Sequence, residues 1–456
     1  MIERFPYGKA PFWLFALAIA SSVLLVATRR QAAVDRPDLT IATFAVQHYS
    51  AYRRILPDFE RQHHVKVGIE LVDQRALQTR LQNAMLAHAA VPDLVEIMDG
   101  TIGFFTRGPL NDVGFVDLTE RVQREGYREQ MVASRFSKWE SRGRLFAVPH
   151  DVHPVMLAYR ADLVEKLGID VTQLDTWEAF AAEGRKVTAD VNGDGALDRY
   201  MIDLPSAGGF GLSLLLVQRG VALFDERGHV AFDEPRTVDT LLWYLHQVHG
   251  PQRISTECGW GQPLAKAMSD GVALFYLASD WRSFLIQTDV PQLAGKMKLM
   301  PLPAWEKGGR RTSTWGGTGL AITKQSAHQE LAWQLAKFLY FNPSELGRRF
   351  AATGILPPFR AVWSRPEFQA PNAFFSGQPL GAEYARLAPE TPTVRDSAYS
   401  STVEAKLSEV LLRSGARFDR EGERGLRESV QRDLTEAAEY VARVMERNVL
   451  GGEAEP

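Results

Sequence analysis

The sequence predicts an α/β fold in which mostly parallel β-sheet is covered by helices. Short apolar, β-like runs alternate with runs whose apolar residues recur every three or four positions, and this succession is typical of β–α–β units. The chain has 456 residues, which at about 150 residues per domain corresponds to two or three domains. No internal repeat or low-complexity tract interrupts the alternation, so a repeat architecture is not expected.

The composition excludes several classes of protein. The 52 Lys and Arg residues nearly balance the 55 Asp and Glu residues, with a net charge of -3. Proteins that bind nucleic acid by bulk electrostatics usually carry a strong basic excess, so no nucleic-acid partner is expected. The single cysteine, Cys258, rules out an intrachain disulfide, a cysteine-based zinc site and an iron–sulfur cluster.

Residues 1–35 are predicted to be an export segment. Arg4 and Lys9 precede the uncharged run Pro11–Ala27, and Arg29–Arg30 ends it. A basic start followed by an apolar stretch is typical of an export signal. The run is short for a membrane span. The residues after it form a poor cleavage site, and they include no cysteine that could accept a lipid. We therefore expect an uncleaved signal anchor, with a cleaved signal peptide and a buried helix as alternatives.

The next five segments form a β–α–β–α–β succession. Strands are predicted over Leu39–Phe44, Val65–Val72 and Leu94–Met98, and helices over Ser50–His63 and Leu77–Ala90. The apolar residues of each helix fall on one face, which would cover a sheet. This order predicts that the three strands are parallel neighbours.

Further elements follow along the rest of the chain. Helices are predicted over Thr176–Val187, Val238–His249, Glu330–Phe341 and Leu426–Arg447. Strands are predicted over Met156–Tyr159, Tyr200–Leu204, Val272–Tyr276, Lys298–Met300 and Leu320–Thr323. Proline-rich joints occur at Pro149–Pro154, Pro301–Pro303 and Pro357–Pro358.

Four blocks of sequence carry a resemblance to a known family. They are VPDLVEIMDG (Val91–Gly100); GRLFAVPHDVHPVMLAYRADLVEKLGID (Gly143–Asp170) with TWEAF (Thr176–Phe180); DVNGDGALDRY (Asp190–Tyr200); and STWGGTGLAITKQSAHQELAWQLAKFLYF (Ser313–Phe341) with GILPPFRAVW (Gly354–Trp363). In order and spacing they resemble the extracellular solute-binding proteins of ABC importers, of the carbohydrate-binding type related to maltose-binding protein. The chain departs from that family in lacking a lipidated cysteine, and in reading HDVH at its first crossing with Arg160 where Asn is usual.

The resemblance implies a two-lobed periplasmic-binding-protein-like fold of type II, with a ligand cleft between the lobes. One lobe would hold residues 38–149 plus 312–356, and the other residues 150–311 plus 357–450. The crossings are expected near Pro149–Pro154, Trp305–Arg311 and Pro357. A ligand that contacts both lobes would select the closed form.

The resemblance also implies a function. We expect a non-enzymatic monomer that captures a sugar or oligosaccharide for the permease subunits of an ABC transporter. It would work at the periplasmic or extracellular face of the bacterial inner membrane, either secreted or tethered to the membrane through its N-terminal segment. The alternative is a membrane-tethered sensor of the same fold that presents a bound solute to a signalling partner. A two-lobed carbohydrate-active enzyme is a third possibility, but no motif supports it.

Polar and aromatic residues at strand ends form the predicted site. In open α/β sheets ligands bind beyond the carboxyl ends of strands. Carboxylates, amides and imidazoles bind sugar hydroxyls, and aromatic faces cover the apolar C–H surface of a sugar ring. The candidate ligand-binding residues are Phe44, His48, Gln74, Asp99, His150, Asp151, Asp280, Trp281, Trp315, Gly316 and Gly317.

Structural roles are the alternatives for the tryptophans. Trp281 could be a core residue beside Asp280, which would cap the next helix. Trp315 could mark a strained β-bulge before its two glycines. Trp260, in a glycine-bounded loop, could reach the cleft. Two further tryptophans on helices are expected in the core, Trp243 and Trp333.

One loop resembles the first half of a calcium-binding loop. Its candidate oxygen ligands alternate along the chain, at Asp190, Asn192, Asp194 and Asp198. Met201 stands where a bidentate Glu would be expected. A structural calcium ion is therefore a hypothesis, and a tight Asx-rich turn is the alternative. No other cofactor is expected.

Overall fold

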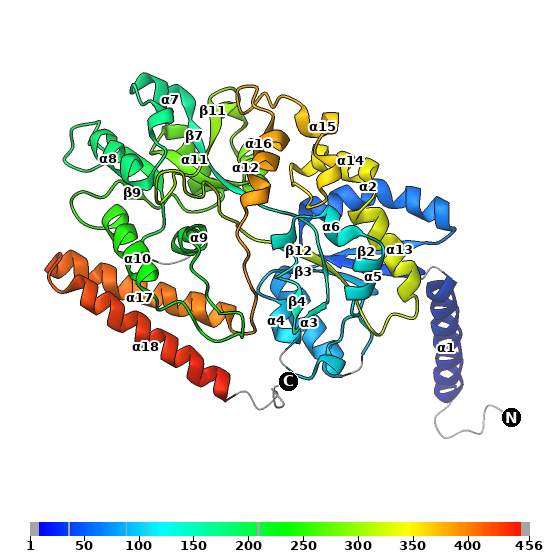
Figure 1. Ribbon diagram of the computed structural model, residues 1–456. Helices are drawn as coiled ribbons and strands as arrows, with labels where there is room; N and C mark the ends of the chain where they lie inside the picture. Colours follow the sequence, from blue (N-terminus) through cyan, green and yellow to red (C-terminus); the bar gives the residue numbers. More distant parts are fainter. Residues whose placement is uncertain (1–8, 35–36, 88, 107, 208–209, 448–456) are drawn as a thin grey trace.

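Two five-stranded sheets, each covered by helices, form two lobes that lie side by side (Figure 1). The computed structural model describes residues 9–34, 37–87, 89–106, 108–207 and 210–447. One large apolar cluster takes in residues of both sheets, such as Ile41 of the first and Tyr276 of the second. Another cluster packs on the second sheet alone and includes Leu157 and Phe275. The predicted two-lobed α/β architecture is confirmed, whereas the boundaries of the lobes stay a prediction.

The first sheet has the strand order β2-β1-β3-β12-β6. Its strands are β1 (Leu39–Thr43), β2 (Val67–Leu71), β3 (Leu94–Met98), β6 (Val148–Pro149) and β12 (Thr318–Ile322). β1 pairs in parallel with β2 and β3, as predicted. β12 is antiparallel to β3 and β6, because it enters the sheet at the edge where β3 ends: Thr318 pairs with Met98. In this sheet the prediction of mostly parallel pairing is confirmed for β2, β1 and β3 and is wrong for β12 and β6.

The second sheet is also mixed, with the order β11-β7-β10-β8-β9. Its strands are β7 (Val155–Arg160), β8 (Tyr200–Asp203), β9 (Ser255–Thr256), β10 (Ala273–Ser279) and β11 (Met297–Pro301). β7 is antiparallel to β10 and β11, whereas β8 pairs in parallel with β9 and β10. A short separate hairpin is formed by β4 (Glu140–Ser141) and β5 (Arg144–Leu145).

Helices cover both sheets. The longer ones are α2 (Val46–His63), α3 (Gln74–Leu86), α8 (Trp177–Val187), α9 (Phe210–Arg219), α10 (Pro235–Val248), α11 (Gln262–Asp270), α12 (Asp280–Asp289), α13 (Gln329–Tyr340), α14 (Pro343–Thr353), α16 (Leu380–Leu387), α17 (Ser400–Glu421) and α18 (Leu426–Glu446). The shorter ones are α4 (Ile102–Phe105), α5 (Thr119–Arg124), α6 (Tyr127–Gln130), α7 (Ala161–Lys166) and α15 (Pro366–Gln369). The predicted helices are confirmed within a few residues at each end.

Local sequence explains where several helices begin. α8 starts after Thr176, whose Oγ1 accepts a hydrogen bond from the Ala179 backbone N–H at 3.2 Å. α14 starts after Asn342, whose Oδ1 accepts from the backbone N–H of Ser344 at 3.0 Å. Such side-chain caps satisfy N–H groups that have no partner inside the helix.

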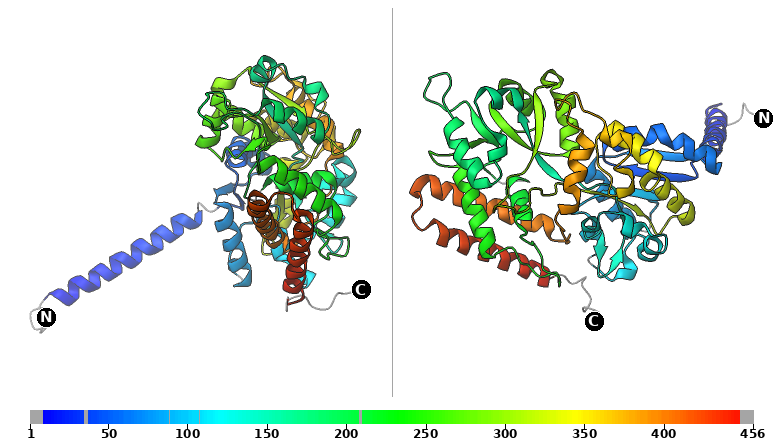
Figure 2. Two further views of the ribbon diagram at one scale, coloured as in Figure 1. Left: turned by 90° about the vertical axis from the view of Figure 1, so that its left-hand side faces the viewer. Right: turned by 45° about the horizontal axis from the view of Figure 1, so that its top comes forward.

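The helix α1 (Ala10–Val34) projects away from both lobes (Figure 2). Among the residues that the structure describes, no helix is long and apolar enough to cross a membrane. That finding gives no support to the predicted membrane-spanning anchor. The basic start of the predicted export segment, with Arg4, lies outside the described residues.

Three chain segments that connect the lobes run side by side. Val155 donates its backbone N–H to Ser313 O at 3.2 Å, and Val152 donates to Leu356 O at 3.0 Å. The first crossing therefore lies after β6, the return crossing before β12, and the third near Leu356. This arrangement gathers backbone from distant parts of the sequence beneath the cleft.

The return crossing lies further along the chain than Trp305–Arg311. Trp305 packs inside the second lobe, with its ring centroid 5.2 Å from that of Trp243 and 6.3 Å from that of Trp177. The chain reaches the other lobe only at residues 312–317, before β12 begins.

Candidate ligand-binding site

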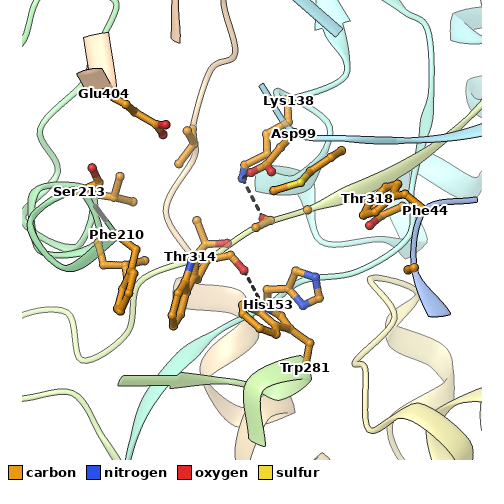
Figure 3. Close-up of a pocket in the computed structure, with 18 of the residues that line it drawn as sticks. Phe44, Asp99, Lys138, His153, Phe210, Ser213, Trp281, Thr314, Thr318 and Glu404 are labelled. Carbon is orange, nitrogen blue, oxygen red and sulfur yellow. Dashed lines mark hydrogen bonds and ion pairs between the residues drawn. The ribbon is translucent and has the colours of Figure 1, made fainter. Parts of the chain in front are cut away.

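A cavity of about 840 Å³ lies between the two lobes, a volume within the usual range for small-molecule sites. The first lobe contributes Phe44, His48, Met98, Asp99 and Lys138 to its lining. The second lobe contributes Phe210, Ser213, Leu214, Trp260, Trp281, Leu285 and Glu404. The crossings contribute His153, Thr314, Trp315, Gly316, Gly317 and Ile355 (Figure 3). A ligand in this cavity would touch both lobes and the segments that join them.

Four aromatic residues, Phe210, Trp260, Trp281 and Trp315, form an aromatic wall on one side of the cavity. The rings of Trp260 and Trp281 are nearly parallel, at 9°, with their centroids 6.3 Å apart. Trp315 meets both of them edge-on, and Phe210 stacks on Trp315 with the centroids 4.3 Å apart. Trp260 is 49% exposed, so its ring is accessible to a ligand.

Hydrogen bonds and a buried cation hold the aromatic wall in place. Trp281 Nε1 donates to Trp315 O at 3.0 Å. The guanidinium of Arg282 lies 4.7 Å from the ring centroid of Trp260 and 5.1 Å from that of Trp315. Arg282 Nη2 also pairs with Asp203 Oδ2 at 3.3 Å. The positive charge behind the wall is therefore balanced within the protein.

The opposite side of the cavity is polar. Lys138 Nζ lies 2.5 Å from Asp99 Oδ2 and donates to Gly316 O at 2.9 Å. Gly316 has a φ of 86°, a left-handed backbone conformation that favours glycine. At Gly317 a Cβ atom would lie 2.9 Å from Arg135 Nη2. The two glycines thus let this backbone turn and approach the polar side closely.

A buried charged network joins the crossings beneath the cavity. His153 Nδ1 lies 2.6 Å from Asp280 Oδ1, and its Nε2 lies 3.1 Å from Asp151 Oδ2. Arg135 Nε donates to Asp151 O at 3.0 Å, and its Nη2 pairs with Asp151 Oδ1 at 3.4 Å. Asp280 Oδ2 accepts the backbone N–H of Leu356 at 2.7 Å. His153 therefore links the first crossing to the start of α12, and Asp280 links α12 to the third crossing.

The network shifts the pKa values of its members in a consistent direction. Burial alone would lower the pKa of His153, but the carboxylates of Asp151 and Asp280 raise it to about 9. Burial alone would raise the pKa of Asp151, but the charge of His153 and the hydrogen bonds from His150 and His153 hold it well below its usual range. At neutral pH this network therefore contains an imidazolium between two carboxylates.

A second buried cluster lies where α2 meets the first sheet. Glu96 Oε2 lies 2.9 Å from His48 Nδ1 and accepts from Thr43 Oγ1 at 2.5 Å. Its Oε1 accepts from Tyr52 at 2.5 Å and from Tyr340 at 2.8 Å. Burial would raise the pKa of Glu96, but the charge and hydrogen bond of His48 outweigh it and keep the pKa low. Four donors already occupy this carboxylate.

His150 packs against this cluster. Its ring centroid lies 3.9 Å from that of His48. Burial and the neighbouring charge of His48 lower the pKa of His150 to about 3. Ligand atoms of His48, Glu96 and His150 lie within 4.8 Å of one another, the spacing of a metal site. The hydrogen bonds already made by Glu96 describe a filled polar network instead, which orients His48 at the cavity.

The structure separates the predicted ligand-binding residues into two groups. Those that line the cavity are Phe44, His48, Asp99, Trp281, Trp315, Gly316 and Gly317. Their contact with a ligand stays a prediction. Gln74 does not line it, because it lies exposed at the start of α3. His150, Asp151 and Asp280 are at most 1% exposed and also lie outside the lining. The last three residues lie in the crossings and the polar clusters. Ligand contact at these four positions stays a prediction, which the lining of this cavity does not support.

Sequence reasoning missed several residues that line the cavity. Lys138 follows a short helical turn, and Phe210 lies at the start of α9. Glu404 lies on α17, where a solvated helix face was expected instead of a cavity lining. One signal was present for Glu404. On α17, Ser401, Glu404, Ala405 and Ser408 recur at helical spacing opposite a buried apolar face, which marks a second, polar face.

The loop proposed for calcium binds its own backbone. Asp190 accepts the backbone N–H groups of Gly193 and Gly195 at 2.6 and 2.7 Å. Asn192, Asp194 and Asp198 likewise accept from nearby backbone N–H groups. This is the pattern of the Asx-rich turn. The calcium hypothesis stays a prediction, and isothermal titration with Ca²⁺ that releases no heat would remove it.

Comparison with known proteins now decides the family. The model of the family described as "Bacterial extracellular solute-binding protein" matches residues 45–345. The chain belongs to this family. The match covers every strand of the two sheets except β1, and most of the residues that line the cavity. It confirms the family resemblance seen in the four sequence blocks.

Similar proteins cover most of the chain. An arabinooligosaccharide-binding protein of Halalkalibacterium halodurans is 25% identical over 380 residues, which are 81% of this chain and 83% of that protein. An arabinooligosaccharide-binding protein of Bacillus subtilis is 23% identical over 74% of this chain and 77% of that protein. The structure of the sugar-binding protein MalE from Xanthomonas citri shares the fold, with a TM-score of 0.73 and 20% identity, over 90% of this chain and 99% of that one.

Proposed function

We propose that this solute-binding protein captures a sugar or oligosaccharide by closing its two lobes, and delivers it to an ABC transporter. The observation that carries the proposal is the cavity between the lobes, with an aromatic wall on one side and hydrogen-bonding groups on the other. Aromatic faces cover the C–H surface of a sugar ring, while carboxylates and backbone groups bind its hydroxyls. The names of the two arabinooligosaccharide-binding relatives support this class of ligand.

Lobe closure is the physical mechanism of capture. The ligand would contact groups from both lobes, so the closed form would bind it more tightly than the open form. The three adjacent crossings, tied together by His153, Asp151 and Asp280, would act as the hinge. Hinge closure of this kind needs changes in only a few backbone angles.

The test is ligand-induced stabilisation of the purified full chain. Thermal unfolding would be followed in the presence of a panel of arabino-, gluco- and galacto-oligosaccharides and their monosaccharides. A ligand at about 100 times its Kd should stabilise the folded state by about 2.7 kcal/mol. Tryptophan fluorescence should change with the same ligand, because three tryptophans line the cavity. Absence of any response across the panel would refute the proposal.

A matched pair of variants locates the binding. Trp260→Ala removes an exposed ring from the aromatic wall, and we expect it to weaken binding about tenfold or more, since burying an aromatic ring is worth about 1.5–3 kcal/mol. Trp13→Ala removes another exposed tryptophan, 66% exposed on α1, and should leave the Kd unchanged. Equal affinities of the two variants would place the ligand elsewhere.

We also propose where the protein works and which partners it has. The family description is of an extracellular protein, which supports a location in the periplasm or outside the cell. We further propose that the protein is a non-enzymatic monomer whose partners are the permease subunits of the transporter. The alternative of a sensor gains no support from the comparisons, and neither does an enzyme.

A further inference from the structure

One carboxylate at the cavity has no cation beside it. Glu404 lies on α17 and lines the cavity, and its carboxylate is directed into the space between the lobes (Figure 3). It is solvent-exposed, and within the described part of the chain it makes no ion pair. An ionised carboxylate in this position can pair with a positively charged group of the ligand.

The cations near the cavity are already committed to other anions. Lys138 pairs with Asp99 and also donates to Gly316 O. His153 lies between Asp151 and Asp280. The buried guanidinium of Arg282 pairs with Asp203 behind the aromatic wall. None of these positive charges is left over to balance Glu404.

A second carboxylate adds to the negative charge near α17. Asp396 precedes this helix, and its Oδ1 accepts from Ser397 N at 2.8 Å and Ser400 Oγ at 2.9 Å. Its Oδ2 is buried without a partner. Burial, and then the charge of Asp99, raise the pKa of Asp396 to about 6, so it is mostly ionised at neutral pH.

The effect of these charges is visible at Glu404 itself. Although its side chain reaches solvent, the surrounding protein displaces water and raises its pKa, and the charges of Asp99 and Asp396 raise it further against the opposing effect of Lys138. Anions that raise the pKa of Glu404 would equally favour a positive charge placed next to it. They would repel a uronate or a sulfated sugar.

We propose that the cavity binds a carbohydrate that carries an amino group, with the ammonium against Glu404 and the sugar ring against the aromatic wall. This inference rests on the proposed function and narrows its ligand. An ammonium offers three N–H donors and balances the carboxylate, whereas a hydroxyl offers one donor and no charge. Three serines, Ser213, Ser401 and Ser408, also line the cavity. The hydroxyls of Ser213 and Ser401 can accept hydrogen bonds from the ammonium N–H groups that do not bind Glu404.

The test compares sugars that differ only in this group. Calorimetric titration of the full chain at low ionic strength, where screening is weakest, would use glucosamine against glucose and galactosamine against galactose. It would also use glucosamine, N-acetylglucosamine and glucose β-1,4-oligomers of equal length. We expect the amino member of at least one set to bind about tenfold or more tightly than its neutral partners, the usual range for a charge-assisted hydrogen bond.

Two variants assign the preference to Glu404. Glu404→Gln keeps the size of the side chain and removes its charge, and should abolish the amino preference by bringing the affinity for each amino sugar down to that of its neutral partner. Glu428→Gln removes an exposed carboxylate from α18, outside the cavity lining, and should keep the preference. Thermal unfolding of each variant would report its folding.

The outcomes separate this inference from the proposed function. If neutral or N-acetylated sugars bind as tightly as the amino sugars, or more tightly, the inference is wrong and the carbohydrate function stands. An amino preference that survives in Glu404→Gln would also overturn it, because the preference would then come from another group. If no sugar in either panel binds, both the inference and the proposed function fail.

Discussion

Replacing His153 with glutamine tests the charged network that ties the crossings together. Gln keeps an amide donor and a similar reach, but it cannot carry the positive charge that lies between Asp151 and Asp280. Removing one partner of a buried charged group typically costs about 3–5 kcal/mol, because the remaining charges are left uncompensated. Arg135 still pairs with Asp151 in the variant, so we expect a loss at the lower end of that range.

The pH dependence gives an independent magnitude. The pKa of His153 is about 9 in the folded protein, against 6.5 for an unperturbed histidine. Between these values the folded state binds more protons than the unfolded state, so stability falls as the pH rises. The stabilisation from His153 is fully present below about pH 6.5 and is lost as the pH rises through about 9. At about 1.36 kcal/mol per pKa unit, it amounts to roughly 3 kcal/mol.

Urea unfolding followed by circular dichroism, from about pH 6 to about pH 10, measures both effects. We expect His153→Gln to lower the free energy of unfolding by about 3 kcal/mol at the acid end. The gap between the variant and the original chain should narrow as the pH rises. His229→Gln, at a side chain that is 71% exposed, is the control and should leave the pH profile unchanged. A constant gap at every pH would refute the charged role of His153.

Three further substitutions test packing, capping and the buried polar cluster. In Gly319→Ala a new Cβ would lie 2.7 Å from the ring of Trp139, and we expect a loss of about 1–3 kcal/mol in urea unfolding; unchanged stability would mean that the ring moves freely. Asn342→Ala removes the cap of α14 and should cost about 1 kcal/mol, whereas Asn342→Asp should restore most of it. Glu96→Gln replaces a carboxylate that accepts four hydrogen bonds and should cost about 3 kcal/mol or more in thermal or urea unfolding; a neutral effect would show that the cluster is not charged.

Much of the fold could be predicted from the sequence because it depends on local periodicity. Buried apolar residues at helical spacing predicted α2, α8, α10, α13 and α18. The direction of β12 was not predictable in this way, since it depends on which edge of the sheet the chain reaches when it returns from the second lobe. On α17 the polar face is the ordinary pattern of a solvated amphipathic helix, so local periodicity could not show that this face lines a cavity.

For the ligand site, too, some residues could be predicted from the sequence and others could not. Trp281 and Trp315 follow or precede strands, so the rule that ligands bind at strand ends placed them at the cavity. The same rule did not foresee that His150, Asp151 and Asp280 lie outside the cavity lining, because it does not say whether another segment covers a strand end. Here His153 contacts Asp151 and Asp280, from a position 127 residues away from Asp280 in sequence. The backbone N–H of Leu356 also binds Asp280, and the ring of His48 packs on His150.

The sequence by itself determined the family, the α/β elements and the aromatic character of the ligand site, since these depend on residue type and spacing along the chain. Tertiary structure alone decided which charges face one another across the cleft. Glu404 looks like a solvated residue on a helix until the second lobe folds α17 against the cavity, opposite the pair formed by Lys138 and Asp99. Coulomb interactions depend on distance in space and on the exclusion of water, and neither quantity follows from the local order of residues.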